Sequence, residues 1–488
     1  MMAGRHASIH DPATERGVAA LLMRVLLVSC YELGHQPLHL ASAGAFLRAA
    51  GHDVSAVDLS VQTLGDTDLD APELVAIAVP MHTAMRMAVP VARAIRARRG
   101  SHVRIVFFGL YAPLCGPALE PGLVDALIGG EYERALVAVA DGAPDSRSIV
   151  LDRLTFPLPA RDLLPPLDRY TRLQVDGEER LTGYVEATRG CVHTCRHCPV
   201  PAVYDGRIRV WQRDVLVEDV GRLWDGGMRH LTFGDPDFLN AVPHALGVVG
   251  AVHERWPDLT FDITTKIEHI LEHPDAIAEL RELGVLFIVS AVESTSPLVL
   301  DVLEKGHSQE DVVSALRICR SLGIELRPSL LPFTPWSTLR DQVDLLDMIA
   351  AYDLIDSVDP VQLSIRLLVP PGSLLLSLPE MRAHLLGYDP EGFSHLWQHP
   401  DPAMDRLQAE IAAVVAADAD AGVEPRSTHI AIRTLTARTA AGAGLPWPDA
   451  GTPLPPQRAA PPRLSEPWFC CAEPTTAQLA GAGVAVGA

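Results

Sequence analysis

Short apolar runs alternate with helical stretches over residues 23–150. The runs include RVLLVSC, DVSAVDL, LVAIAVP and VRIVFFG, and stretches such as AGAFLRAAG and MAVPVARAIRARRG separate them. Unbroken apolar runs of this length are typical of strands buried on both faces, and the helices between them indicate crossover connections. We therefore predict a Rossmann-like, doubly wound parallel sheet. Its ligands are expected in loops at the carboxyl ends of the strands, around residues 31–35, 80–83 and 109–113.

A proline-rich segment, FPLPARDLLPPLDRY, follows within residues 151–180. Proline cannot join a central strand and stiffens a connector, so we predict a linker here. Strand and helix patterns then repeat over residues 181–340, in TGYVEATRG, RHLTFGDPDF, LTFDITTK, VLFIVSAVES and IELRPSLL. Repeated units of this kind predict a full or partial barrel of the TIM type, with its site at the carboxyl-end face.

The remaining segments are predicted by composition. Residues 1–22 read as a disordered arm, and residues 341–440 as a strand and helix extension that caps the substrate side. Residues 441–488 are rich in proline, alanine and glycine, a composition that cannot bury enough apolar surface to stay ordered alone. We expect a flexible tail there.

Composition and charge exclude two classes of protein. Hydrophobic residues make up 48% of the 488 residues, yet no apolar run approaches the eighteen or so residues that a membrane span needs. The formal charge of −21 opposes a polyphosphate partner, so nucleic acid is not expected. Cys30, Cys115 and Cys319 stand singly, which suits a reducing cytoplasm better than a disulfide scaffold.

Three further cysteines crowd into the stretch RGCVHTCRHC, at Cys191, Cys195 and Cys198. Three thiolates on one loop hold three irons of a cubane [4Fe-4S] cluster and leave the fourth iron open for chemistry. The alternative is a zinc site that uses Cys195, Cys198 and two distant ligands, with His193 and His197 as further neighbours. Zinc ribbons carry a second paired motif at the usual spacing, and this chain has none.

The CVHTCRHC motif resembles the CxxxCxxC signature of the radical SAM superfamily. Further motifs of the superfamily follow the cysteines in the same order. TFGDPDF resembles the segment whose backbone receives the amino group of S-adenosylmethionine, and SAVESTS resembles the segment whose glutamate approaches the ribose. LLPFTP takes the place of the adenine-contacting segment without its usual glycines, and His197 replaces a common aromatic residue. The resemblance implies a partial (β/α)6 barrel, a cluster at the three cysteines, and cofactor contacts at Gly234, Asp235, Asp237, Glu293 and Ser294.

The predicted sheet resembles the cobalamin-binding module that precedes many radical SAM barrels, through GHQPLHLASAGAFLRAAGHDVSAVD and VDALIGGEYERAL. The DxHxxG motif, which would supply a histidine to cobalt, is absent. The resemblance therefore implies cobalamin without a histidine ligand below the metal, and His35, His39 and His82 are interpreted as loop or helix-end residues. A sheet that binds no corrinoid is the alternative.

The tail carries WFCCAEP, and this ending resembles the CUAEP/CCAEP-tail radical SAM family, in which some members carry selenocysteine at the position of Cys471. Trp468 and Phe469 offer an apolar anchor, so we predict that the tail folds back over the open face of the barrel. The resemblance then implies a redox or nucleophilic role for Cys470 and Cys471, with Cys471 the more reactive thiol.

Two classes of function remain. In the first, the chain is a radical SAM enzyme that acts on an unknown small molecule, by cobalamin-dependent methyl transfer or, without cobalamin, by a redox or rearrangement step with the cysteine pair. Such an enzyme needs a reducing partner of the flavodoxin or ferredoxin type. In the second, it is a non-catalytic protein that binds a metal or cluster. The order of the motifs favours the enzyme.

Overall fold

The computed structural model of the chain describes residues 22–143 and 147–466. Cys470 and Cys471 therefore lie outside the described residues, as does the predicted arm up to residue 21. No helix in the described part of the chain is long and apolar enough to cross a membrane.

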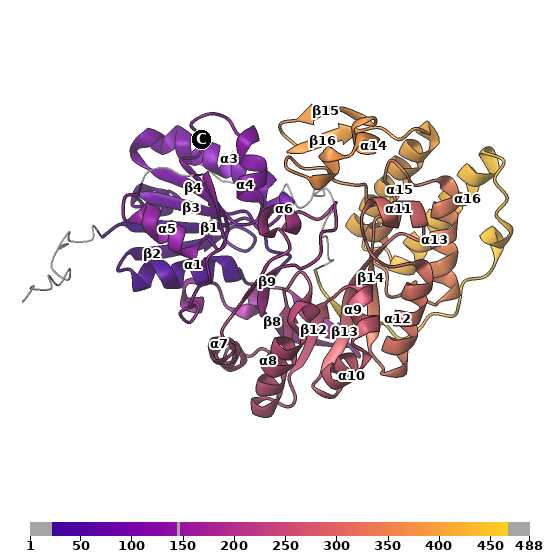
Figure 1. The fold of residues 1–488 in the computed structure, drawn as a ribbon, viewed down its shortest axis with the longest axis horizontal. Helices are drawn as coiled ribbons and strands as arrows, with labels where there is room; N and C mark the ends of the chain where they lie inside the picture. Colours follow the sequence, from indigo (N-terminus) through magenta and orange to yellow (C-terminus); the bar gives the residue numbers. More distant parts are fainter. Residues whose placement is uncertain (1–21, 144–146, 467–488) are drawn as a thin grey trace, which may run out of the picture.

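The first unit is a six-stranded parallel sheet in the order β2-β1-β3-β4-β5-β6 (Figure 1). This order reverses between β1 and β3, which is where doubly wound sheets form their ligand crevice. The predicted Rossmann-like fold is confirmed. The strands are β1 (Arg24–Ser29), β2 (Asp53–Asp58), β3 (Leu74–Ala78), β4 (Arg104–Phe108), β5 (Ala126–Gly130) and β6 (Arg147–Val150).

Both faces of this sheet are buried, because neighbouring residues of a strand point to opposite faces. Val25 and Leu27 pack with α1 and α5, whereas Leu26 and Val28 pack with α3 and α4. The near-continuous apolar runs of the sequence therefore follow from burial on two sides. The helices of this unit are α1 (Leu38–Ala49), α2 (Asp66–Asp70), α3 (His82–Arg99), α4 (Tyr111–Cys115) and α5 (Glu133–Ala140).

The proline-rich segment packs tightly between the two units. Phe156 stacks on Trp211 with ring centroids 3.8 Å apart. The buried guanidinium of Arg161 pairs with Asp219 at 2.8 Å on the barrel side and donates to Gln36 at 3.1 Å on the sheet side. The segment therefore fixes the first sheet against the barrel.

The second unit is a curled half-barrel whose sheet has the order β14-β13-β12-β11-β8-β7-β17. Five strands run parallel, from β8 to β14, and an isolated parallel bridge between Phe333 and Arg366 occupies the place of a sixth. The predicted partial barrel is confirmed. Its strands are β7 (Arg172–Val175), β8 (Glu178–Val185), β11 (His230–Phe233), β12 (Thr260–Thr264), β13 (Val285–Glu293), β14 (Glu325–Leu330) and β17 (Arg463–Leu464).

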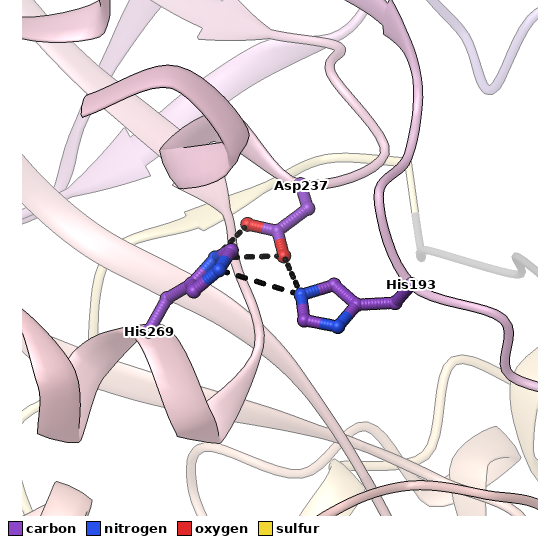
Figure 2. A group of neighbouring side chains, drawn as sticks. All are labelled: His193, Asp237 and His269. Carbon is purple, nitrogen blue, oxygen red and sulfur yellow. Dashed lines mark hydrogen bonds and ion pairs between the residues drawn. The ribbon is translucent and has the colours of Figure 1, made fainter. Parts of the chain in front are cut away.

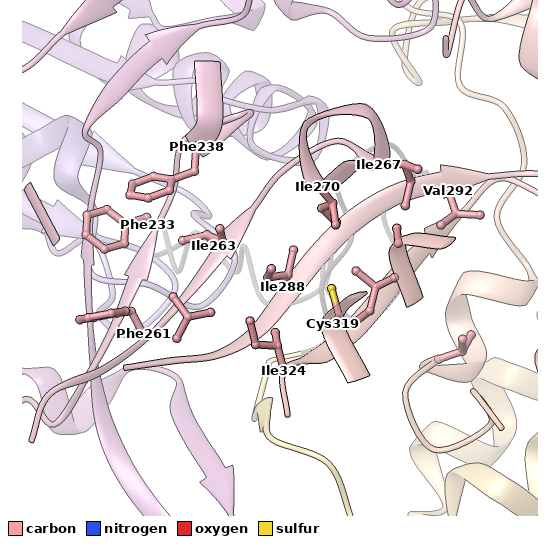
Figure 3. Packing of buried hydrophobic residues seen from close by; sticks show 14 of the residues in the cluster. Phe233, Phe238, Phe261, Ile263, Ile267, Ile270, Ile288, Val292, Cys319 and Ile324 are labelled. Carbon is pink, nitrogen blue, oxygen red and sulfur yellow. The ribbon is translucent and has the colours of Figure 1, made fainter. Parts of the chain in front are cut away.

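Helices cover the outer face of the half-barrel. Phe233, Phe261, Ile263 and Ile288 pack beneath them, and Cys319 is fully buried in the same cluster (Figure 3). The helices are α7 (Arg213–Asp225), α8 (Val242–Arg255), α9 (Ile267–Glu272), α10 (Pro274–Glu282), α11 (Pro297–Val302), α12 (Gln309–Ser321) and α13 (Leu339–Ala351).

The C-terminal extension adds helices beside the half-barrel and a hairpin facing the first sheet (Figure 1). Its elements are α14 (Pro379–Arg382), β15 (Leu385–Asp389), β16 (Ser394–Trp397), α15 (Pro402–Asp420) and α16 (Pro425–Gly442). The chain then returns to the half-barrel, where β17 pairs antiparallel with β7.

Candidate functional site

The three motif cysteines lie on the loop between β9 (Thr188–Gly190) and α6 (Val200–Tyr204). Gly190 has a φ of 81°, and a Cβ atom there would lie 2.2 Å from the carbonyl oxygen of Arg207, so only glycine fits this turn. At the other side of the loop, the backbone N–H of Arg196 donates to the carbonyl of Leu303 at 3.0 Å. The loop is therefore held at both ends.

All three thiols, of Cys191, Cys195 and Cys198, line one cavity. Burial raises the pKa of Cys191 to about 11, which favours the protonated thiol over the thiolate. Asn240 supports the loop, because its Oδ1 accepts a hydrogen bond from the backbone N–H of Val192 at 3.3 Å and lies 3.7 Å from the sulfur of Cys191. Sequence reasoning missed Asn240, which follows the recognised GDPDF segment by two residues.

Gly234 and Asp235 follow β11 and lie directly behind this loop. The buried carboxylate of Asp235 accepts hydrogen bonds from the backbone N–H groups of Ala187 and Thr188, at 2.9 and 2.6 Å, and from the Thr188 hydroxyl at 2.6 Å. Burial still raises the pKa of Asp235 to about 7. This carboxylate therefore holds the residues that follow β8 in place, and both Gly234 and Asp235 line the cavity.

Asp237 lies two residues further on and meets two histidines (Figure 2). Its carboxylate accepts from Nδ1 of His269 at 3.0 Å and from the Thr265 hydroxyl at 2.7 Å, and its Oδ2 lies 3.5 Å from Nε2 of His193. Burial opposes ionisation, but hydrogen bonds from His193 and His269 outweigh it and hold the pKa of Asp237 well below its usual range. His269 was not predicted; it lies on α9, just after the predicted strand LTFDITTK.

Glu293 ends β13 with a left-handed φ of 63°, a strained conformation for this residue type. Its Oε1 lies 3.1 Å from Nε2 of His197 and 3.3 Å from the Lys305 ammonium. Burial alone would raise the pKa of Glu293, but Lys305 and His197 lower it to about 2. Ser294, which follows, accepts from the backbone N–H of Ser296 at 3.1 Å.

Lys305 is almost wholly buried, and it interacts electrostatically with Cys195 and Cys198 as well as with Glu293. A buried cation beside two metal-binding thiols offsets their negative charge. Lys305 lies in the VLEKGHS stretch after Glu293, but nothing in the sequence indicates that it interacts with the cysteines. Lys266, a second cation at the cavity, pairs with Glu268.

The first sheet forms the opposite wall of the cavity, which holds roughly 350 Å³. The loops after β1, β3, β4 and β5 contribute to it, and they include the loops where the sequence pattern predicts a ligand. Their lining residues are Glu32, Leu33, His35, His39, Pro80, Met81, His82, Thr83, Gly109, Leu110, Tyr111, Gly130 and Tyr132. The site therefore lies where the carboxyl ends of both sheets face each other.

The histidines of this wall have the partners expected of loop and helix-end residues. His82 contacts the carbonyl of Gly392 at 2.8 Å, and His39 contacts Glu32 at 3.0 Å. His35 packs on the ring of Tyr184, and burial lowers its pKa to about 4. The loops of this wall lie at the switch point between β1 and β3, where doubly wound sheets bind their ligands.

A buried charge network joins the two walls. The Arg189 guanidinium, on β9, donates to Glu186 at 2.7 Å and to Glu133 of the first unit at 2.8 Å, and it lies 3.7 Å from Glu131. Tyr204 donates to Glu131 at 3.0 Å. The GGEYER segment, recognised from its resemblance, thus contacts the strand that leads into the cysteine loop.

The last described residue also reaches the cavity. Glu466 lines it and accepts a hydrogen bond from the Tyr31 hydroxyl at 2.7 Å. Ser465 is fixed by bonds to Thr171 at 3.0 Å and to the backbone of Arg172. The predicted role of Cys470 and Cys471 concerns residues outside the described part of the chain.

Comparisons with known proteins identify a similar family and similar folds. Residues 185–347 match the model of the Radical SAM superfamily. The hopanoid C-3 methylase of Methylococcus capsulatus is 25% identical to the chain over 331 residues, which cover 63% of each protein. The solved cobalamin-dependent S-adenosylmethionine radical enzyme OxsB, with aqua-cobalamin bound, has a TM-score of 0.65 at 15% identity over 82% of this chain and 67% of OxsB.

TsrM of Kitasatospora setae is a radical S-adenosylmethionine methyltransferase solved with cobalamin and a [4Fe-4S] cluster. It has a TM-score of 0.61 at 15% identity over 86% of this chain and 100% of TsrM. These structures establish the fold, and the match spans 63% of the length of the hopanoid methylase. Residues 185–347 are thus similar to the Radical SAM superfamily, in which the domain implies a [4Fe-4S] cluster and S-adenosylmethionine.

Proposed function

We propose that the chain is a radical SAM enzyme that transfers a methyl group to a small molecule with cobalamin as a further cofactor. The observation that carries the proposal is the single cavity shared by the three motif cysteines and the switch-point loops of the first sheet. The relatives of the chain include hopanoid methylases, and its structural neighbours include enzymes solved with cobalamin.

The residues of the cavity have different roles. Cys191, Cys195 and Cys198 hold the cluster, which when bound supplies an electron to S-adenosylmethionine at its open iron. The backbone at Gly234 and Asp235 receives the amino group of S-adenosylmethionine, with Asp237 behind it. Glu293, oriented by Lys305 and His197, and Ser294 lie on the ribose side. The wall of the first sheet holds cobalamin, which when bound carries the methyl group, and excludes water from the cavity.

Anaerobic reconstitution tests the enzyme assignment. We expect about four irons per chain and cleavage of S-adenosylmethionine to 5′-deoxyadenosine under reduction. Alanine at Cys191, Cys195 or Cys198 removes both, whereas Cys319→Ala, in the core, keeps both. Iron bound without any cleavage would instead support the second class, a non-catalytic cluster protein.

Equilibrium dialysis with hydroxocobalamin tests the methyl-transfer part separately. We expect retention by the folded protein in a base-off form without a histidine ligand from the chain. A protein that cleaves S-adenosylmethionine but retains no cobalamin would contradict methyl transfer through cobalamin and leave the radical SAM assignment intact.

The position of Glu466 favours a second candidate function, a redox step that uses the cysteine pair in the manner inferred from the CUAEP/CCAEP-tail resemblance. Cys470 follows Glu466, which lines the cavity, by four residues in the sequence. Cys471→Ser then leaves cleavage of S-adenosylmethionine intact and stops formation of product from the true substrate. Normal turnover by this variant would remove the pair from the mechanism.

The proposal includes two requirements outside the chain. The cluster needs electrons from a flavodoxin or ferredoxin, and an open cluster persists in a reducing cytoplasm. Six cysteines of the described residues are free thiols, which is consistent with such a compartment.

A further inference from the structure

His193, Asp237 and His269 come from three segments and converge at one point (Figure 2). His193 lies on the cysteine loop, Asp237 follows β11, and His269 lies on α9. Their candidate ligand atoms all lie within 4.8 Å of one another. We propose that these three side chains bind one divalent cation of the Zn²⁺ type, separate from the cluster and independent of the function proposed above.

The spacing of the donor atoms matches a tetrahedral metal site. Nε2 of His193 lies 3.3 Å from Nε2 of His269 and 3.5 Å from Oδ2 of Asp237. Two ligands at about 2.0–2.1 Å from a tetrahedral zinc ion are themselves about 3.3 Å apart. Two imidazoles and a carboxylate are also the donor set of many zinc sites that keep an open position.

The carboxylate of Asp237 lies between the two imidazoles. The residue is 1% exposed, and its Oδ2 lies 3.0 Å from Nδ1 of His269 and 3.5 Å from Nε2 of His193. Burial of a carboxylate costs free energy unless a cation pairs with it. This carboxylate therefore suits a cation at the point where the two imidazoles meet.

The neighbours of the three residues form the outer shell that metal sites need to orient their ligands. The Thr265 hydroxyl and the backbone N–H of Leu239 donate to Oδ1 of Asp237, at 2.7 and 3.3 Å, and so hold the carboxylate with its Oδ2 toward His193. On the other side, Glu268 lies 3.9 Å from Nδ1 of His193.

The competing arrangement has no metal: the two imidazoles share a proton, and Asp237 balances the charge. The two arrangements differ in what they do at the cavity, which both His193 and Asp237 line. A three-ligand cation leaves a fourth position open to the cavity, where it binds water or a substrate oxygen and polarises it. A shared proton offers no such position.

The test uses the full chain with its cluster loaded, equilibrated with Zn²⁺ alone and then desalted. We expect about one zinc per chain, with only nitrogen and oxygen ligands at about 2.0–2.1 Å in zinc-edge X-ray absorption. His269→Gln, on a helix outside the cysteine loop, loses the zinc and keeps its iron. Thr265→Val, which removes an outer-shell donor, weakens zinc binding about 10–100-fold.

His102→Gln is the matched control, because His102 is exposed and remote from the cavity lining, and it keeps wild-type zinc. Equal zinc in wild type and His269→Gln overturns the proposal. Sulfur ligands at about 2.3 Å from the zinc also overturn the proposal, because they would place the zinc at the cysteines. If the radical SAM assignment is wrong, the protein does not cleave S-adenosylmethionine but still holds zinc, so this failure is distinguishable from failure of the zinc proposal.

Discussion

Glu293 shows what a single residue can and cannot reveal before the fold is known. It could be nominated because SAVESTS resembles the radical SAM segment whose glutamate approaches the ribose. Its partners were not predictable: His197 lies 96 residues away, and Lys305 reaches it only because α11 brings the chain back. The same holds for Asp237 and His269, which meet because β11 and β12 are neighbours.

The pairing of Lys305 with Glu293 predicts a large loss of stability when one partner is removed. Lys305→Met leaves a buried carboxylate without its cation, which costs about 3–5 kcal/mol of unfolding free energy. Thermal unfolding of the cluster-free chain measures this loss of unfolding free energy. Lys305→Met/Glu293→Gln recovers most of the loss, since neither charge then remains.

Arg438 provides the surface comparison for this prediction. It pairs with Glu410, and both side chains are exposed, so Arg438→Met changes the unfolding free energy by only about 0–1 kcal/mol. If Lys305→Met had an effect as small as Arg438→Met, the Lys305 ammonium would not be the main partner of Glu293.

At the scale of elements, the long strands and helices were predictable because apolar runs and periodic patterns mark them. The edge strand of the half-barrel, β17, was not predictable in this way. β17 is two residues long, Arg463 and Leu464, and lies in a proline-rich stretch with no strand pattern. It forms only because β7, almost 290 residues earlier, offers an unpaired edge.

Chain truncation measures the contribution of this edge. A chain that ends at Pro462 loses β17, the Tyr31–Glu466 hydrogen bond and the bonds of Ser465. At about 0.5–1.5 kcal/mol for each hydrogen bond, we expect a loss of about 2–4 kcal/mol relative to a chain that ends at Glu466. Thermal unfolding compares the two chains. Identical midpoints would mean that β17 does not stabilise the half-barrel.

At the scale of the molecule, the two units were predictable separately and their interface was not. The GGEYER segment was recognised, but the sequence does not show that Glu131 and Glu133 converge on Arg189. That contact depends on how the proline-rich segment sets the sheet against the barrel. Arg189 also lies 5.0 Å from the ring centre of Tyr132, so the first unit surrounds the cation that precedes the cysteine loop.

Glu131 makes the interface sensitive to pH. Burial raises its pKa from 4.5 to about 7, so the folded chain binds this proton more tightly than the unfolded chain does. The stability it contributes is complete below pH 4.5 and is lost as the pH rises towards 7. Glu131→Gln cannot ionise. We therefore expect its melting temperature, relative to wild type, to increase between about pH 5 and about pH 8.

An exposed glutamate gives the reference for this measurement. Glu254 lies exposed on α8, so the difference between Glu254→Gln and wild type should be the same at both pH values. A pH-independent difference for Glu131→Gln as well would show that Glu131 is ionised in the folded chain throughout this range.

The hydrogen bond between Tyr31 and Glu466 has a consequence for how the protein is made. It closes the cavity rim with residues 435 positions apart, from the first and the last described loops. Domains fold in order as the ribosome releases them, at about 5–20 residues per second. The first sheet and the cysteine loop are thus released before the strand that closes the rim. In a chain whose last residues are still unmade, the hydrogen bond that closes this side of the rim has therefore not yet formed.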